Sequence, residues 1–130
     1  MDVVSIPLSK PNQKISASET FELKEDNNTY QLNIKIIEQN IIFNIKNINY
    51  ILEEYEKELN LEELKQIHNI FLGLNSCQEF LEYIKGLIKN NKLSINIIDE
   101  NKISIIIFVE YLLKQSQIDI ALKKKILALI

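Results

Sequence analysis

The hydrophobic residues of this chain change their spacing twice, and this change restricts the fold more than any other feature. Apolar and polar residues alternate over residues 30–46, apolar residues take the spacing of a helix over residues 60–88, and alternation returns from residue 93. Alternation is typical of a strand with one buried face, whereas apolar residues three and four apart are typical of an amphipathic helix. The pattern therefore predicts an α+β domain with a helical segment inserted between two sets of strands.

Before the helical segment, the pattern predicts three strands joined by polar turns. The clearest alternating segments are residues 4–8, 30–36 and 41–46. Pro7 lacks a backbone N–H, so a strand through it is restricted to a sheet edge. Residues 11–18 are expected to form a loop, and Phe21 and Leu23 precede a polar turn. Residues 47–59 fit neither period.

The helical segment is predicted to be an αα-hairpin inserted midway in the domain. Asn60 and Glu63 have the spacing of a capping box, in which each side chain accepts from the backbone N–H of the other residue. Ser76 and Glu79 repeat this spacing after a break at residues 73–75. Two amphipathic helices joined by a tight turn are therefore expected.

The second set of strands surrounds a turn at residues 99–101. In the strand after this turn, Ile106 and Phe108 are apolar although they share the face opposite to Ile105 and Ile107. A strand that is apolar on both faces suits a central position, covered by sheet on one face and by the helix pair on the other.

The end of the chain has two readings. Residues 112–116 are expected to form a loop. After it, either Ile118, Ile120 and Leu122 form a last short strand, or residues 117–130 form one helix capped by Ser116. Periodicity does not choose between them.

The 130 residues suit one domain of ordinary size. The expected fold is an antiparallel sheet or small β-sandwich with an inserted αα-hairpin, in the order βββ-αα-βββ. Residues 1–19 are assigned to a lead-in segment that includes an edge strand, residues 20–125 to a single α+β head domain, and residues 126–130 to a tail that begins a helix.

The composition argues against binding to nucleic acid. The chain has 25 Ile, 15 Asn and 15 Lys but no Arg, a set that A/T-rich codons explain, and its formal net charge is −3. Affinity for nucleic acid depends on cationic neutralisation of phosphates, and Arg supplies bidentate contacts that Lys reproduces poorly. A nucleic-acid partner is therefore not expected.

The sequence also favours a cytoplasmic protein. No apolar run approaches the roughly 20 residues that span a bilayer, so no membrane partner is expected. The first residues lack the basic flank and apolar stretch of a secretory signal. With one cysteine, Cys77, the chain cannot form an internal disulfide, which is consistent with a reducing compartment.

Few residues suggest catalysis, and we expect no catalytic, cofactor-binding or metal-binding residue. His68 is the single histidine and lies at the edge of a helix stripe, so it is interpreted as structural. Cys77, in the first turn of the second predicted helix, is interpreted as a small, partly buried residue. Two glycines cannot build a Gly-rich phosphate-binding loop, so no cofactor or small-molecule substrate is expected.

Two groups of residues are candidates for a protein interface. One is the apolar pair Ile106 and Phe108, on the strand that is apolar on both faces. The other is an acidic group without the spacing of a calcium-binding loop, which is otherwise interpreted as a solvated face. Its members with interface potential are Glu53, Glu54, Glu56 and Glu58.

Residues 30–125 resemble a head-domain pattern of coiled-coil proteins from A/T-rich protists. The matching segments are residues 30–34 (YQLNI), 42–45 (IFNI), 59–64 (LNLEEL), Phe71 followed by 76–80 (SCQEF), and 118–123 (IDIALK). In topology the chain is similar to the globular heads of the centriolar cartwheel protein and of the end-joining scaffold superfamily. The resemblance implies a small sandwich with an inserted helical pair that leads into a parallel coiled coil. Because no heptads precede residue 130, we expect a head fragment or a head that acts alone.

The sequence therefore favours a non-enzymatic protein-interaction or oligomerisation head of a structural scaffold, cytoplasmic and cytoskeletal or ciliary. Its partner would be another protein or a second copy, bound through a strand edge or an apolar patch. Two alternatives stay open: a ubiquitin-like adaptor module, and a small enzyme or subunit whose site uses His68 or the acidic group.

Overall fold

The computed structural model describes residues 15–50 and 53–125, and seven strands in these ranges form one antiparallel sheet. The spatial order is β1-β2-β3-β4-β7-β6-β5. The strands are β1 Ile15–Glu25, β2 Asn28–Ile37, β3 Asn40–Asn47, β4 Glu54–Asn60, β5 Leu93–Asp99, β6 Lys102–Tyr111 and β7 Lys114–Lys124. The helical insert consists of α1 Leu61–Ile67, the 3-10 helix η1 Asn69–Phe71 and α2 Cys77–Lys89. An α+β fold with a helical insert is thus present.

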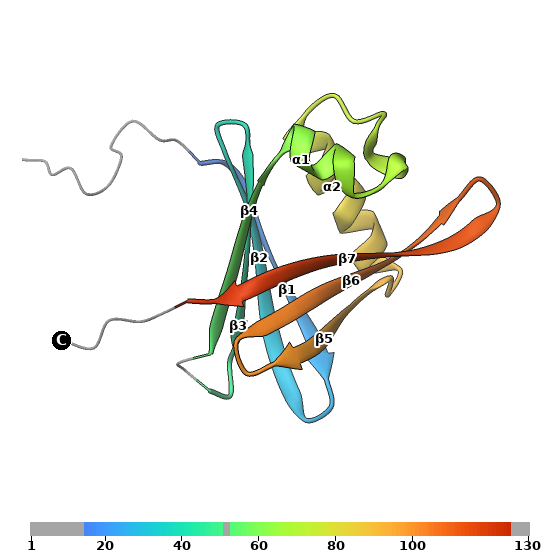
Figure 1. Cartoon of the computed structure of the whole chain (residues 1–130). Helices are drawn as coiled ribbons and strands as arrows, with labels where there is room; N and C mark the ends of the chain where they lie inside the picture. Colours follow the sequence, from blue (N-terminus) through green and yellow to red (C-terminus); the bar gives the residue numbers. More distant parts are fainter. Residues whose placement is uncertain (1–14, 51–52, 126–130) are drawn as a thin grey trace, which may run out of the picture.

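The sheet is strongly curled, and the helices lie at one end of it (Figure 1). Its two edge strands, β1 and β5, approach each other without pairing. The two halves of the sheet join at β4 and β7, where the pairing is short: Tyr55 faces Lys124 and Glu56 faces Lys123. The curl places apolar faces of both halves around one interior.

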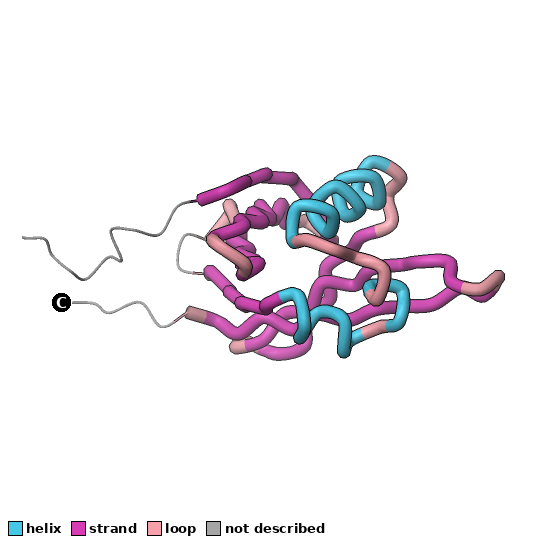
Figure 2. Tube along the Cα trace, turned by 90° about the horizontal axis from the view of Figure 1, so that it is seen from above, coloured by secondary structure: helices cyan, strands magenta, loops and turns pink. Residues whose placement is uncertain are grey.

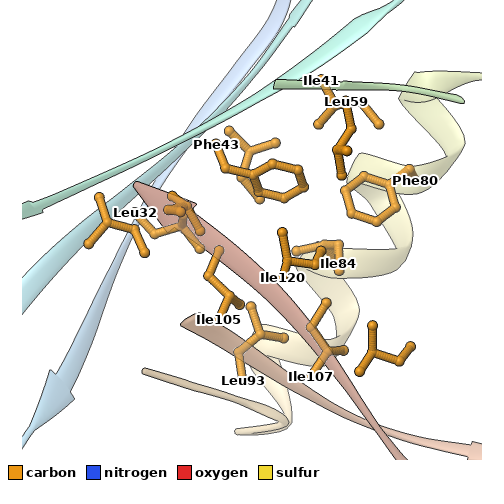
Figure 3. Close-up of a cluster of buried hydrophobic side chains, with 14 of the residues drawn as sticks. Leu32, Ile41, Phe43, Leu59, Phe80, Ile84, Leu93, Ile105, Ile107 and Ile120 are labelled. Atoms are coloured by element: carbon orange, nitrogen blue, oxygen red, sulfur yellow. The ribbon is translucent and has the colours of Figure 1, made fainter. Parts of the chain in front are cut away.

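Alternation of side chains explains the core. Tyr30, Leu32, Ile34 and Ile36 on β2 point inward and are buried, while the residues between them are only partly covered. Side chains from β3, β6 and β7 meet them, and α2 closes the interior with Phe80 and Ile84. Figure 3 shows this cluster, in which the rings of Phe43 and Phe80 pack edge to face with centroids 5.8 Å apart.

Four strands precede the helices among the described residues, where the alternating segments 30–36 and 41–46 predicted two. β1 begins at Ile15, inside the segment predicted to be a loop. The sequence did not indicate this strand because none of its residues is fully buried, so its apolar residues do not alternate clearly with polar ones. β4 lies within residues 47–59 and Asn60, where neither period fitted. The alternation was not recognised because Lys57 stands between the buried residues Tyr55 and Leu59. The strand predicted around Pro7 lies outside the described residues.

The helical insert follows the predicted capping signals but ends its first helix early. In the capping box of α1, Glu63 N donates to Asn60 Oδ1 at 2.8 Å and Asn60 N donates to Glu63 Oε1 at 2.9 Å. Ser76 caps α2 as expected. The first helix stops at Ile67, because the backbone of His68 is extended and a separate turn of 3-10 helix follows.

The last strand also differs from the prediction. The loop predicted over residues 112–116 is a two-residue turn, Leu112 and Leu113, and β7 already starts at Lys114. The helical reading of residues 117–130 is wrong as far as Lys124, since β7 pairs with β6 along its length. The tail at 126–130 lies outside the described residues.

Candidate interaction surface

The β6–β7 hairpin extends beyond the rest of the described structure and ends in two exposed leucines. Both views show the hairpin as a projection at the side of the helices (Figure 1 and Figure 2). Leu112 is 77% exposed and Leu113 is 94% exposed. Two adjacent leucines at the tip of a projecting hairpin form an apolar knob that the core of this domain does not use.

The backbone of this turn is unusual for leucine. Leu112 has φ 55° and Leu113 has φ 67°, so both central residues are left-handed. A two-residue hairpin turn with both φ values positive is normally built from Asn and Gly, which tolerate this conformation. Leucine there costs roughly 1–2 kcal/mol per residue. The two leucines therefore disfavour folding in two ways: their apolar side chains are exposed to water, and their backbones have positive φ values.

A groove lies between α2 and the base of the same hairpin. Its volume is about 610 Å³. Tyr83 and Leu87 of α2 form one wall, and Phe108 of β6 contributes an exposed ring. The groove is also lined by polar side chains: Lys92, Glu110, Gln115, Ser116 and Gln117. A groove that combines aromatic and aliphatic side chains with polar ones can receive an apolar side chain from a protein partner.

His68 connects the helical insert to this hairpin. Its Nδ1 accepts a hydrogen bond from the N–H of Ile70 at 3.0 Å, and its Nε2 lies 3.1 Å from the Oγ of Ser116. Because Nδ1 is an acceptor, the neutral ring carries its proton on Nε2 and donates it to Ser116. The imidazole therefore does not act as a base toward this hydroxyl. Its ring also packs edge to face against Tyr111.

Cys77 is buried at the start of α2, and its Sγ lies 3.4 Å from the carbonyl oxygen of Gln39. Burial raises the pKa of this thiol. A raised pKa keeps the group in its less reactive thiol form. These contacts agree with the interpretation of Cys77 as a small packing residue.

The predicted interface residues lie in different surroundings. Ile106 is buried on the outer face of β6, so the protein surface does not present it. Phe108, two residues on, is exposed and lines the groove. Both faces of β6 are buried from Ile103 to Ile107, as the apolar residues on both faces of this strand predicted.

The acidic group separates into two parts. Glu54 and Glu56 belong to the β4–β7 junction, where Lys125 Nζ lies 3.3 Å from Glu54 and 3.9 Å from Glu56. Asn44 Nδ2 donates to Glu54 at 2.7 Å, and this hydrogen bond lowers the pKa of the Glu54 carboxyl although burial opposes it. Glu58 is exposed on the same strand, whereas Glu53 lines a separate hollow.

Within residues 15–50 and 53–125, no three His, Cys, Asp or Glu side chains are grouped so that they could hold a metal ion. In the same ranges, no helix has the length and apolar character needed to cross a membrane.

The sequence analysis did not identify Leu112 and Leu113 as functional residues, because it assigned residues 112–116 to a loop and not to the tip of a hairpin. One signal could have identified them: no typical turn-forming residue such as Gly, Asn, Asp or Pro lies between the alternating segments that end at Val109 and begin at Ile118.

Sequence comparisons find no relative: no protein-family model matches the chain, and no curated protein matches it. The three-dimensional structure does match. The crystal structure of the head domain of human CCDC61 superimposes with a TM-score of 0.65, covering 84% of this chain and 97% of that chain. The fold is similar to the CCDC61 head domain. The sequence identity is 6%, so the similarity to CCDC61 concerns the fold alone. It confirms the resemblance to coiled-coil head domains that the sequence suggested.

Proposed function

We propose that this domain is a non-enzymatic head that binds a second copy of itself through the β6–β7 hairpin, within a cytoplasmic or cytoskeletal scaffold. The observation that carries the proposal is the pair Leu112 and Leu113, exposed at a turn whose backbone disfavours leucine. Residues that both strain the backbone and expose apolar surface are expected at a binding site, where contact with a partner covers that surface.

A second copy is the partner that best fits both parts of the surface. The groove begins four residues before Leu112, at Phe108, and continues two residues after Leu113, at Gln115. At about 3.3 Å per residue, knob and groove are separated by roughly 10 Å along one hairpin. Two copies related by a two-fold axis can therefore each place the knob in the other's groove, which gives a closed, symmetric contact.

The expected contact is apolar at its centre. Burial of one leucine contributes about 1.5–3 kcal/mol relative to exposure. The polar residues that line the groove, which include Lys92 and Glu110, can pair across the same contact. Similarity in fold to the head domain of human CCDC61 supports an interaction role. The resemblance of the sequence to the head of the centriolar cartwheel protein supports a place in a cytoskeletal scaffold.

The ubiquitin-like alternative is less well supported, since a single continuous helix would favour it and the insert contains α1, η1 and α2. The enzyme alternative also has little support at His68, because both ring nitrogens make structural hydrogen bonds.

Sedimentation equilibrium over a wide concentration range tests the proposal. We expect reversible dimerisation of the wild-type chain, weakened at least 30-fold in the double variant Leu112→Asn, Leu113→Gly, because a hot-spot residue contributes about 2 kcal/mol or more. The replacement residues suit the turn, so this variant keeps the hairpin folded. Leu72→Asn removes another exposed leucine, outside the hairpin, and is the matched control.

The groove is tested separately with Phe108→Ser. A mixture of this variant with the double turn variant still contains one intact knob and one intact groove. The mixture should therefore form a weaker heterodimer although neither variant dimerises alone. A wild-type chain that stays monomeric at millimolar concentration, or dimerisation unaffected by the double variant, contradicts the proposal.

A further inference from the structure

The β6–β7 hairpin has an open strand edge near its base. β5 pairs with β6 only as far as Ile107, which faces Leu93, the first residue of β5. The N–H of Phe108 then donates to the carbonyl oxygen of Lys92 at 2.8 Å. Beyond Phe108, no strand of the described residues pairs with β6 on this side, and the hairpin continues alone (Figure 1).

The backbone of Glu110 faces this open edge. Tyr111 and Lys114 pair with each other on either side of the two-residue turn, so they exchange both backbone hydrogen bonds. Since hydrogen-bonded pairs alternate along an antiparallel ladder, Glu110 directs its N–H and C=O away from β7. The bond from Phe108 to Lys92 agrees with this direction, because Phe108 lies two residues before Glu110. Among the described residues, neither a strand nor a loop supplies a backbone partner for Glu110 on that side.

The open edge is part of the groove. Phe108, Val109 and Glu110 of β6 line the groove together with Tyr83 and Leu87 of α2. A groove that combines an open strand edge with apolar side chains suits an added strand, whose backbone makes the hydrogen bonds while its side chains enter the groove. An uncovered edge otherwise favours non-specific pairing, so a specific occupant is expected here.

The shape of the edge selects a short strand that ends in a tight turn. Lys92 already occupies the position beside Phe108, so a chain that pairs with Glu110 has to turn away within a few residues. The tip of the same hairpin does this, because Leu112 and Leu113 reverse the chain direction between β6 and β7. Each copy of the domain therefore carries both the open edge and a tip that fits it, as a two-fold symmetric contact requires.

We infer that β6 of one copy adds antiparallel to the open edge of β6 in the second copy, an inference that rests on the proposed dimer. With the two-fold axis beside Tyr111, Leu112 of each copy lies opposite Glu110 of the other. The N–H of Glu110 then donates to a backbone carbonyl oxygen of the second copy, and the leucines enter the groove that Phe108 lines. Four strands form one ribbon across the dimer, in the order β7-β6-β6-β7, and backbone bonds determine its register.

Hydrogen exchange in the full ¹⁵N-labelled chain tests the inference without any substitution. The amide of Glu110 should exchange at least tenfold more slowly at a concentration that gives the dimer than at one that gives the monomer. The amide of Phe108 is bonded to Lys92 in both states and is the internal control. In the double variant Leu112→Asn, Leu113→Gly, the Glu110 amide should keep its fast monomer rate at both concentrations.

A proline substitution tests the same bond through affinity. Glu110→Pro removes the N–H, and proline is compatible with an edge position whose N–H faces away from the ladder. We expect the dissociation constant of the dimer to rise at least tenfold. Glu110→Ala is the matched control, because it removes the same carboxylate but keeps the N–H, and it should raise the constant less than threefold. Thermal melts check that both variants are folded, and the exchange measurement decides if the proline variant is not.

The outcomes separate this inference from the proposed function. The strand addition is overturned if Glu110 exchanges equally fast in monomer and dimer, if Phe108 slows as much as Glu110, or if proline and alanine weaken the dimer equally. In each of these cases the dimer formed by knob and groove still stands. A chain that stays monomeric at millimolar concentration overturns both proposals.

Discussion

The Nε2 atom of His68 lies 3.1 Å from the Oγ atom of Ser116, and this contact ties the helical insert to the base of the hairpin that carries Leu112 and Leu113. The two residues are 48 positions apart in the chain. Ser116 also lines the groove beside α2. The histidine thus holds the projecting hairpin in a defined orientation to the surface that we propose receives the hairpin of a second copy.

We predict that His68→Ala lowers the free energy of unfolding by about 1–3 kcal/mol, because it leaves the N–H of Ile70 and the hydroxyl of Ser116 without their partner. His68→Asn should recover part of this loss, since an Asn side chain can also accept from that N–H. Ser116→Ala removes only the contact to the hairpin. Urea titrations of the three variants measure the two hydrogen bonds separately. Equal stability of His68→Ala and wild type would contradict the structural role.

The exposed turn gives an unusual stability prediction. Replacing Leu112 by Asn and Leu113 by Gly should stabilise the monomer by about 1 kcal/mol, because both residues accept positive φ values. The corresponding rise in Tm is about 3–5 °C. Tm should be measured at a protein concentration at which the chain is monomeric, because dimerisation itself raises Tm. A lower Tm would show that the leucines stabilise the fold.

Glu54 should make the domain sensitive to acid. The hydrogen bond from Asn44 lowers its pKa in the folded state, and Lys125 adds to this effect. A lowered pKa contributes stability that is present above the unfolded value, about 4.3 for Glu, and lost as the pH falls through the folded value. At pH 7 the wild type should be about 1–2 kcal/mol more stable than Glu54→Gln, and this difference should shrink as the pH falls below about 4.3. Unfolding curves at several pH values check this, with Glu58→Gln as the exposed control on the same strand.

Phe80 should be the most sensitive position of α2. Its buried ring packs edge to face against Phe43 and against Phe71, at 5.8 and 5.6 Å between centroids. Phe80→Ala should destabilise the domain by about 3–5 kcal/mol through lost burial and the cavity that it leaves. Phe80→Leu should cost clearly less, because it refills part of that space. Chemical denaturation monitored by circular dichroism measures both.

Cys77 should react slowly with thiol reagents in the folded protein. Its side chain is buried and its pKa is raised, so little accessible thiolate is present at neutral pH. Labelling with iodoacetamide at pH 8 should be at least 100-fold faster in denaturant than in native buffer. A rate in native buffer close to that of a free thiol would show that the start of α2 opens easily.

Features set by near neighbours could be predicted from the sequence. The capping pair Asn60 and Glu63 is three residues apart, and its two hydrogen bonds form within one helical turn. The alternation along Tyr30 to Ile36 likewise reports one strand with one buried face. Such patterns need only the local geometry of a helix or strand.

Strands whose signal depends on distant neighbours were not predicted correctly. β1 is an edge strand without a fully buried residue, and β4 is recognised only by its pairing with β3 and β7. The hairpin turn was also missed, because leucine is not a turn residue and only the register of β6 and β7 shows that Leu112 and Leu113 occupy the tip.

The α+β class, the central strands and the helix starts follow from the residue pattern of the chain. Only the packing of the whole sheet shows which surfaces are available, because it exposes Phe108 and buries Ile106. A strand's own alternation determines which side chains share a face, whereas the curl and register of the sheet determine what each face meets.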